Sequence, residues 1–177
     1  RDTDRSRGLG DVYKRQRFDE PRMEGVTVPT FEEVLAAFSR RTLMNIQIYA
    51  KSDDVLREIC RLYRAYGMYD RGYLSINNRE QFDRVRELDA GIEICFLPGW
   101  ENRSTPEALR LCRELGCRFV QPVRETVTAG TVALCRELGL RENLFFCDDP
   151  AEAVRLAREG VRGFLTNRIT AMAPIRY

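Results

Sequence analysis

Short apolar runs alternate with longer amphipathic segments along most of the chain. The amphipathic segments are rich in Arg, Glu and Leu, and turns separate them from the apolar runs. This spacing predicts six strands, over residues 43–49, 73–76, 92–97, 118–121, 143–147 and 163–166. It predicts helices over residues 31–38, 53–66, 79–89, 105–115, 126–138 and 150–159.

One structural unit repeats along the sequence. The pattern Leu-Cys-Arg-Glu-Leu-Gly ends two of the predicted helices, at residues 111–116 and 134–139. A glycine follows four of the helices and predicts where each one stops, at Gly67, Gly116, Gly139 and Gly160. Strands that alternate with helices in this way predict parallel β-structure with right-handed crossovers.

A doubly wound sheet and a closed barrel both satisfy this alternation. The even spacing, with no glycine-rich phosphate loop after the first strand, favours a TIM-type (β/α)₈ barrel. Such a barrel has eight strands in about 250 residues. The pattern therefore predicts an α/β fold and leaves the doubly wound sheet open; a barrel would be incomplete, with about six of the eight βα units.

Composition and charge limit the partners of the chain. Hydrophobic residues make up 44% of it, charged residues 32%, and the net charge is only +2. This balance gives no electrostatic reason to expect a nucleic-acid partner. No apolar run approaches the roughly 18–20 residues that span a bilayer. The sequence favours a cytoplasmic location and leaves a membrane partner open.

Six cysteines raise the question of a metal site or disulfides. The sequence contains no C-x-x-C pair and no His. Zinc-ligand spacing is therefore absent, and we expect the cysteines to be small buried hydrophobic residues in a reducing compartment.

The amino-terminal segment differs in character from the rest. Residues 6–16 are basic, contain glycine and lack an apolar period, and they resemble a translated sequencing adapter. Segments of this origin are excluded from fold reasoning. We expect residues 1–16 to be a non-native, disordered leader, and the native sequence of a metagenomic gene fragment to begin at Arg17. The two remaining strands of the barrel would lie upstream of Arg17.

Two segments carry a resemblance to a known family. Residues 28–35 read Val-Pro-Thr-Phe-Glu-Glu-Val-Leu, and the predicted strand that follows contains Asn-Ile-Gln-Ile-Tyr at residues 45–49. This order resembles the helix and the Asn-Ile-Glu-Ile-Lys strand of the glycerophosphodiester phosphodiesterases, and residues 160–167 are similar to the closing Gly-Val-Asp-Gly segment of that family. By this resemblance, residues 17–177 are the carboxyl-terminal part of such a barrel.

The resemblance implies a site, and the residues depart from it. Gln47 takes the position of the metal-binding Glu, and Tyr49 takes that of the phosphate-binding Lys. An amide offers a divalent Ca²⁺ or Mg²⁺ only a neutral oxygen, and a phenol cannot replace an ammonium. By strand alternation, Asn45, Gln47 and Tyr49 share one face. The metal is therefore expected to bind weakly or not at all, and Lys51 is expected to be a solvated loop residue rather than a replacement.

Other family positions provide candidate contacts to a substrate. They are Ser75, Asn77, Trp100 and Phe145. Trp100, the only tryptophan, either stacks on a substrate headgroup or caps the rim of the barrel, and we favour the cap. At two further positions the family has Asn and Asp, and this sequence has Asp148 and Asn167.

The resemblance implies hydrolysis of glycerophosphodiesters to an alcohol and glycerol 3-phosphate, with a His pair as general acid and base. That pair would lie upstream of Arg17, and the chain itself has no His. We expect this fragment to be inactive and the family activity to be impaired. The alternative is a degenerate barrel that binds a small molecule or a protein partner without catalysis.

Overall fold

The computed structural model describes residues 27–173 of the chain. The chain divides into two compact units, Arg1–Val34 and Leu35–Tyr177. The predicted leader, residues 1–16, lies outside the described residues.

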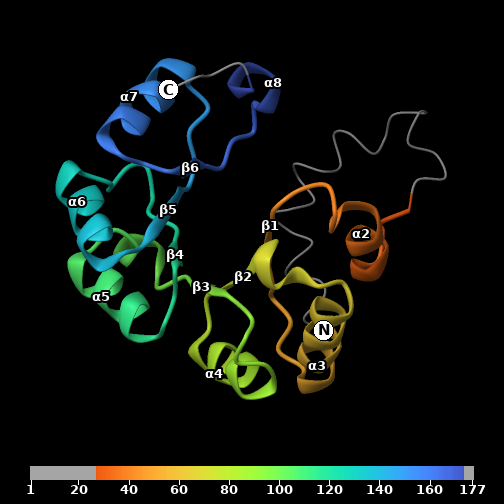
Figure 1. Ribbon diagram of the computed structural model, residues 1–177. Helices are drawn as coiled ribbons and strands as arrows, with labels where there is room; N and C mark the ends of the chain where they lie inside the picture. Colours follow the sequence, from red (N-terminus) through yellow and green to blue (C-terminus); the bar gives the residue numbers. More distant parts are fainter. Residues whose placement is uncertain (1–26, 174–177) are drawn as a thin grey trace. The chain divides into compact units, whose positions relative to one another are not determined.

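Helices and strands alternate through the second unit (Figure 1). The strands are β1 (Met44–Gln47), β2 (Gly72–Ile76), β3 (Ile94–Phe96), β4 (Phe119–Val120), β5 (Arg141–Leu144) and β6 (Gly163–Phe164). The helices are α2 (Phe31–Phe38), which begins in the first unit, α3 (Asp53–Ala65), α4 (Arg79–Leu88), α5 (Pro106–Glu114), α6 (Ala129–Leu138), α7 (Pro150–Glu159) and α8 (Ile169–Met172). Two short 3₁₀ helices are η2 (Met68–Asp70) and η3 (Trp100–Asn102).

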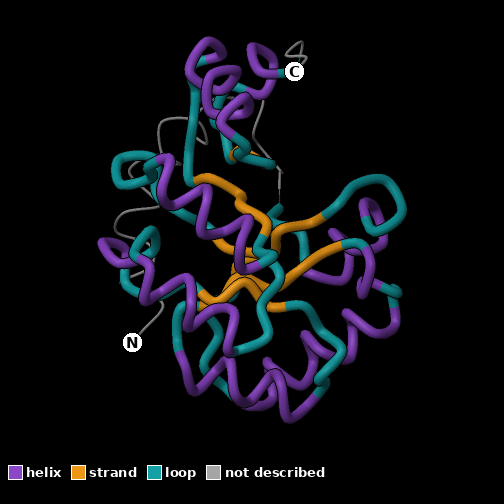
Figure 2. The backbone as a smooth tube through the Cα atoms, turned by 60° about the vertical axis from the view of Figure 1, so that its left-hand side comes forward, coloured by secondary structure: helices purple, strands orange, loops and turns teal. Residues whose placement is uncertain are grey.

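All recorded strand pairs are parallel and follow the order of the chain. One sheet has the order β1-β2-β3 and the other β4-β5-β6. Strands β3 and β4 lie against each other and bring the two sheets together. The strands lie at the centre with helices around them (Figure 2). The predicted α/β architecture, an incomplete TIM-type barrel with six βα units, is confirmed.

Four helices end where the sequence predicts, and one strand begins earlier than predicted. The four glycines predicted to end helices all have positive φ, from 62° at Gly67 to 115° at Gly160, a region open to glycine without a Cβ penalty. The fifth strand was predicted over residues 143–147, but β5 begins at Arg141. Its backbone N–H donates to Arg118 O at 2.8 Å, which starts the pairing with β4 earlier than the apolar pattern indicates.

Side-chain hydrogen bonds, rather than a backbone ladder, join the residues just before β3 to those just before β4. The Arg118 backbone N–H donates to Glu93 Oε1 at 2.7 Å, and its guanidinium donates from Nε to Oε2 at 2.6 Å. The Glu93 side chain is 7% exposed. In the described chain no ladder is recorded between these strands. The Glu93 carboxylate therefore accepts both hydrogen bonds of Arg118 and joins the residues that lead into β3 and β4.

Alternate residues of each strand face the helices and form the main core. The buried residues of this layer come from the strands (Leu74, Ile76, Ile94, Val120, Leu144) and from the helices (Leu56, Tyr63, Val85, Leu109, Leu156). The hydroxyl of Tyr63 donates to Gly72 O at 2.6 Å, which fixes α3 against the start of β2.

A second group of side chains fills the inside of the barrel. Tyr73, Cys95 and Leu97 form a buried cluster with Phe119 packed against it. The rings of Tyr73 and Phe119 stack with centroids 4.7 Å apart, and Asn143 Nδ2 donates to the Tyr73 hydroxyl at 2.6 Å. Burial raises the pKa of Tyr73 to about 12. The phenol therefore stays protonated at neutral pH and serves as a neutral acceptor between β2 and β5.

Two further expectations concern the cysteines and membrane-spanning segments. All six cysteines are buried and free, as predicted. Among the described helices, none is long and apolar enough to cross a membrane.

The Glu93 bridge gives a prediction about stability. Glu93→Gln replaces one acceptor oxygen with an NH₂ group that faces the donors of Arg118, so a buried polar contact is lost. The free energy of unfolding should fall by about 1–3 kcal/mol, measured by urea denaturation. The matched control is Asp83→Asn, which breaks an exposed ion pair with Arg79 on α4 and should cost about 0.3–0.5 kcal/mol. Equal losses in the two variants would show that Glu93 does not replace the ladder.

Candidate functional site at the carboxyl ends of the strands

The end of β1 carries the two residues that depart from the family pattern. Asn45 and Gln47 lie on the exposed side of β1, as the alternation predicted. Tyr49, two residues beyond Gln47, is 70% exposed. The amide of Gln47 and the phenol of Tyr49 are therefore accessible where the strand ends.

Ser75 and Asn77 occupy different environments at the end of β2. Ser75 is buried, and its hydroxyl donates to Asn45 Oδ1 at 2.6 Å. Asn77 is exposed in the loop after β2, where the neighbouring Asn78 caps α4 by accepting from Gln81 N. This geometry assigns Ser75 a contact between β1 and β2, and leaves Asn77 at the surface.

The carboxylates of this end do not fit a divalent cation. Among the described residues, no group of three or more His, Cys, Asp or Glu side chains could hold a metal. Asp148, which follows β5, already accepts from Thr166 Oγ1 at 2.8 Å and from the Asn167 backbone at 2.7 Å. Burial raises the pKa of Asp148, but these hydrogen bonds outweigh it and hold the pKa below its ordinary value.

Trp100 packs against the other predicted aromatic residue. It lies in η3, in the loop between β3 and α5, and its ring meets that of Phe145 edge to face at 5.0 Å. Phe145 follows β5 and is half-buried. Trp100 keeps 49% of its surface exposed. The contact holds one edge of the aromatic pair in place, the exposed half leaves room for a ligand to pack on the ring, and the choice between rim cap and headgroup contact stays a prediction.

The sequence reasoning missed Arg103, which lies beside Trp100. Its guanidinium carbon is 5.1 Å from the centre of the indole ring. Nε donates to Pro98 O at 3.3 Å, and Nη1 donates to Gln121 Oε1 at 3.1 Å. Burial lowers the pKa of Arg103, while Cys95 and Tyr49 act in the opposite direction. The spacing of one helical turn from Trp100 was the only signal in the sequence.

Ser104 holds this loop in place. The Ser104 hydroxyl oxygen accepts from Val123 N at 3.2 Å and from Thr126 Oγ1 at 2.7 Å. Its side chain is buried. These bonds join the loop after β3 to the loop after β4, so that Arg103 and Gln121 are held by contacts on both sides.

Comparison with known proteins shows which fold this is. No protein-family model matches the chain, and no curated protein matches it. A solved structure from Galdieria sulphuraria, provisionally assigned as a glycerophosphodiester phosphodiesterase, matches with a TM-score of 0.73 and 16% identity over 85% of this chain. This chain shares its fold with the glycerophosphodiester phosphodiesterases.

Two further solved structures show how far the likeness extends. An Oleispira antarctica phosphodiesterase in complex with the product sn-glycerol-3-phosphate matches with a TM-score of 0.67 and 13% identity over 83% of this chain. An EAL domain protein from Listeria monocytogenes matches with a TM-score of 0.56 and 16% identity over 77% of it. The chain spans 60–64% of the length of these three proteins.

The glycerophosphodiester phosphodiesterase fold places its chemistry at one end of the strands. In barrels of this kind the active site lies at the carboxyl ends. The exposed residues Gln47, Tyr49 and Trp100 lie at that end, together with the half-buried Arg103. The site proposed below is therefore built there.

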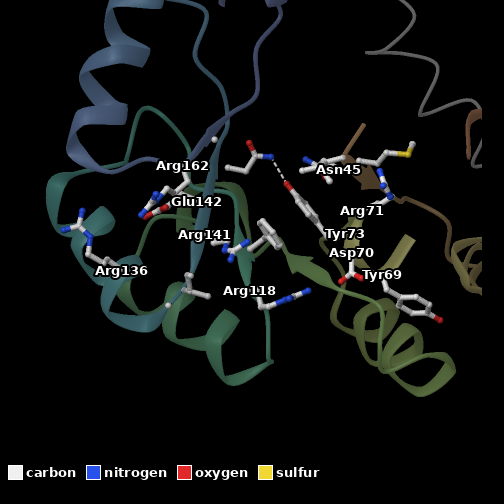
Figure 3. Close-up of a pocket in the computed structure, with 18 of the residues that line it drawn as sticks. Asn45, Tyr69, Asp70, Arg71, Tyr73, Arg118, Arg136, Arg141, Glu142 and Arg162 are labelled. Carbon is white, nitrogen blue, oxygen red and sulfur yellow. Dashed lines mark hydrogen bonds between the residues drawn. The ribbon is translucent and has the colours of Figure 1, made fainter. Parts of the chain in front are cut away.

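A cavity of about 920 Å³ opens at the opposite end (Figure 3). Five arginines line it: Arg71, Arg118, Arg136, Arg141 and Arg162. The guanidinium of Arg118 is bound to Glu93, and those of Arg136 and Arg162 act electrostatically on the buried Glu142. Much of this positive charge therefore balances buried carboxylates of the fold.

Glu142 gives a prediction about pH. Burial raises its pKa above the ordinary value of 4.5, although Arg162 and Arg136 oppose the shift. The folded chain therefore binds this proton more tightly than the unfolded chain, and stability falls as pH rises from 4.5 through the raised pKa. Glu142→Gln cannot titrate, so its stability relative to the wild type should increase over that pH window, measured by urea midpoints. The control is Glu137→Gln, exposed on α6. A constant difference between Glu142→Gln and the wild type would contradict this account.

Proposed function

We propose that this chain binds a glycerophosphodiester at the carboxyl ends of its strands and does not hydrolyse it. The observation that carries the proposal is the make-up of this end of the barrel. Gln47, Tyr49 and Trp100 offer an amide, a phenol and an aromatic face to a ligand. Binding sites for small molecules combine apolar walls with a few convergent polar groups of this kind.

Hydrolysis of a phosphodiester requires proton transfer to the leaving alcohol. A group suited to this has a pKa near the working pH, and His is the usual one. The sequence has no His to serve as such a group. The described carboxylates do not fit a metal that would polarise the phosphoryl group. Binding without turnover is therefore the function that these residues support.

The choice of ligand rests on the likeness of fold. The Oleispira antarctica phosphodiesterase of the same fold holds sn-glycerol-3-phosphate. A glycerophosphodiester contains glycerol 3-phosphate as one half of the molecule. The polar and aromatic side chains at the carboxyl ends of the strands are suited to such a ligand. The second candidate function is hydrolysis by a longer protein that supplies the proton-transfer groups from outside this chain. This second candidate is supported by the length of the chain, which spans only 60–64% of the length of these structural relatives.

Trp100 provides a direct test of the proposal. It is the only tryptophan of the chain and it is half-exposed at the site, so its fluorescence should change when a ligand packs on the ring. Titration with glycerophosphocholine should give a saturable change that glycerol and choline do not give. EDTA should leave the change as it is, because no metal ligand set is present among the described residues.

The same sample separates binding from hydrolysis. Coupled detection of glycerol 3-phosphate should show no release from glycerophosphocholine over hours, with or without Ca²⁺ or Mg²⁺. Metal-dependent release by the purified chain would contradict the absence of turnover. A flat fluorescence titration, confirmed by calorimetry, would contradict binding itself.

A further inference from the structure

Arg103 carries a positive charge at the carboxyl ends of the strands, and no ion pair is recorded for it within the described residues. Within residues 27–173, its recorded polar contacts are to two neutral oxygens, those of Pro98 and Gln121. Arg84 is a useful contrast, because its side chain is 29% exposed and it pairs with both Asp53 and Glu87. A partly desolvated guanidinium normally needs an anion nearby. Arg103 therefore differs from an arginine that serves an ion pair of the fold.

The guanidinium still has donors to offer. An arginine side chain has five N–H groups in a planar fork. Nε and Nη1 of Arg103 each serve one oxygen of the protein, and the Trp100 ring covers one face of the group. No contact to Nη2 is recorded in the described part of the chain. The N–H groups of Nη2 are thus without a recorded hydrogen-bond partner in that part of the chain, and the Arg103 side chain is only partly buried.

The position of Arg103 is fixed before any ligand arrives. Gln121, which accepts a hydrogen bond from Arg103, is buried. Ser104, the next residue in the sequence, is hydrogen-bonded to the loop after β4. A side chain that is already held in one place loses less conformational entropy on binding. Tyr49 acts on Arg103 electrostatically, and its exposed hydroxyl is a further possible donor at the carboxyl ends of the strands.

We propose that Arg103 is the anion-binding residue of this site and that it holds a phosphoryl oxygen of a small organic phosphate. Tyr49 supplies a second hydrogen bond, and the exposed half of Trp100 packs on the carbon skeleton. The inference rests on the proposed function and assigns its charged contact to a loop residue. A planar guanidinium fork suits phosphate oxygens, to which it makes charge-assisted hydrogen bonds.

Calorimetric titrations with three phosphates test the assignment. The ligands are glycerophosphocholine, sn-glycerol 3-phosphate and inorganic phosphate, with glycerol as the neutral control. Arg103→Gln should weaken binding of both organic phosphates by about tenfold to a hundredfold, the range of a lost hydrogen bond to a charged group. Arg103→Lys keeps the charge but loses the fork, and it should recover part of that loss. The matched control Arg110→Gln, exposed on α5, should stay within about twofold of the wild type.

A purely structural role for Arg103 predicts different results. If Arg103 only joins Pro98 to Gln121, both substitutions lower the melting temperature and leave the affinity of the folded protein unchanged, which overturns the proposal. The melting temperature and the ligand-free Trp100 emission of each variant are therefore recorded with the titrations.

The remaining outcomes separate the two proposals. If Arg103→Gln binds the organic phosphates as tightly as the wild type does, the assignment is overturned and the proposed function still holds. A response confined to inorganic phosphate shows a free-anion site and overturns the assignment too. Absence of any binding to the wild type overturns the proposed function, and this inference with it.

Discussion

The Tyr73 ring is the contact on which the assembly of the two sheets depends. It belongs to β2, stacks on Phe119 of β4 and accepts a hydrogen bond from Asn143 of β5. Backbone pairing is not recorded between β3 and β4 in the described residues, so side chains inside the barrel must join one sheet to the other. An aromatic pair contributes about 0.5–1.5 kcal/mol beyond its buried area. The Glu93 bridge to Arg118 reinforces the same junction.

The junction also determines where the functional side chains lie. Loops after β3 and β4 can meet only if those strands lie against each other, and they are then fixed by Ser104 and by the bond from Arg103 to Gln121. Trp100 adds a contact to Phe145 after β5. The carboxyl ends of three strands, two of them in one sheet and one in the other, thus form one rim. Disruption of the Tyr73 contacts would loosen a site that lies at the far end of the same strands.

Periodicity in the sequence was enough to predict the alternation of helices and strands. Apolar runs, helix-ending glycines and even spacing follow from local geometry, which one segment can reveal by itself. Arg103 and Glu93 could not be found in this way, because each acts through a residue 18 or 25 positions away whose position depends on strand pairing. Ser75 donates its hydroxyl to Asn45 Oδ1, a contact that depends on the pairing of β1 with β2, and its contact to a substrate stays a prediction. The roles of Gln47 and Tyr49 stay predictions.

The last βα units show how geometry and chemistry separate in this barrel. At the positions where the resembling family has Asn and Asp, this chain has Asp148 and Asn167, and the two side chains are hydrogen-bonded with Asn167 Nδ2 3.2 Å from Asp148 Oδ2. This contact between an amide and a carboxylate joins the ends of β5 and β6. The negative charge, however, now lies after β5 and is satisfied by neighbouring donors. Such a carboxylate already accepts hydrogen bonds from neighbouring residues, whereas the polar contacts recorded for Arg103 among the described residues are to neutral oxygens.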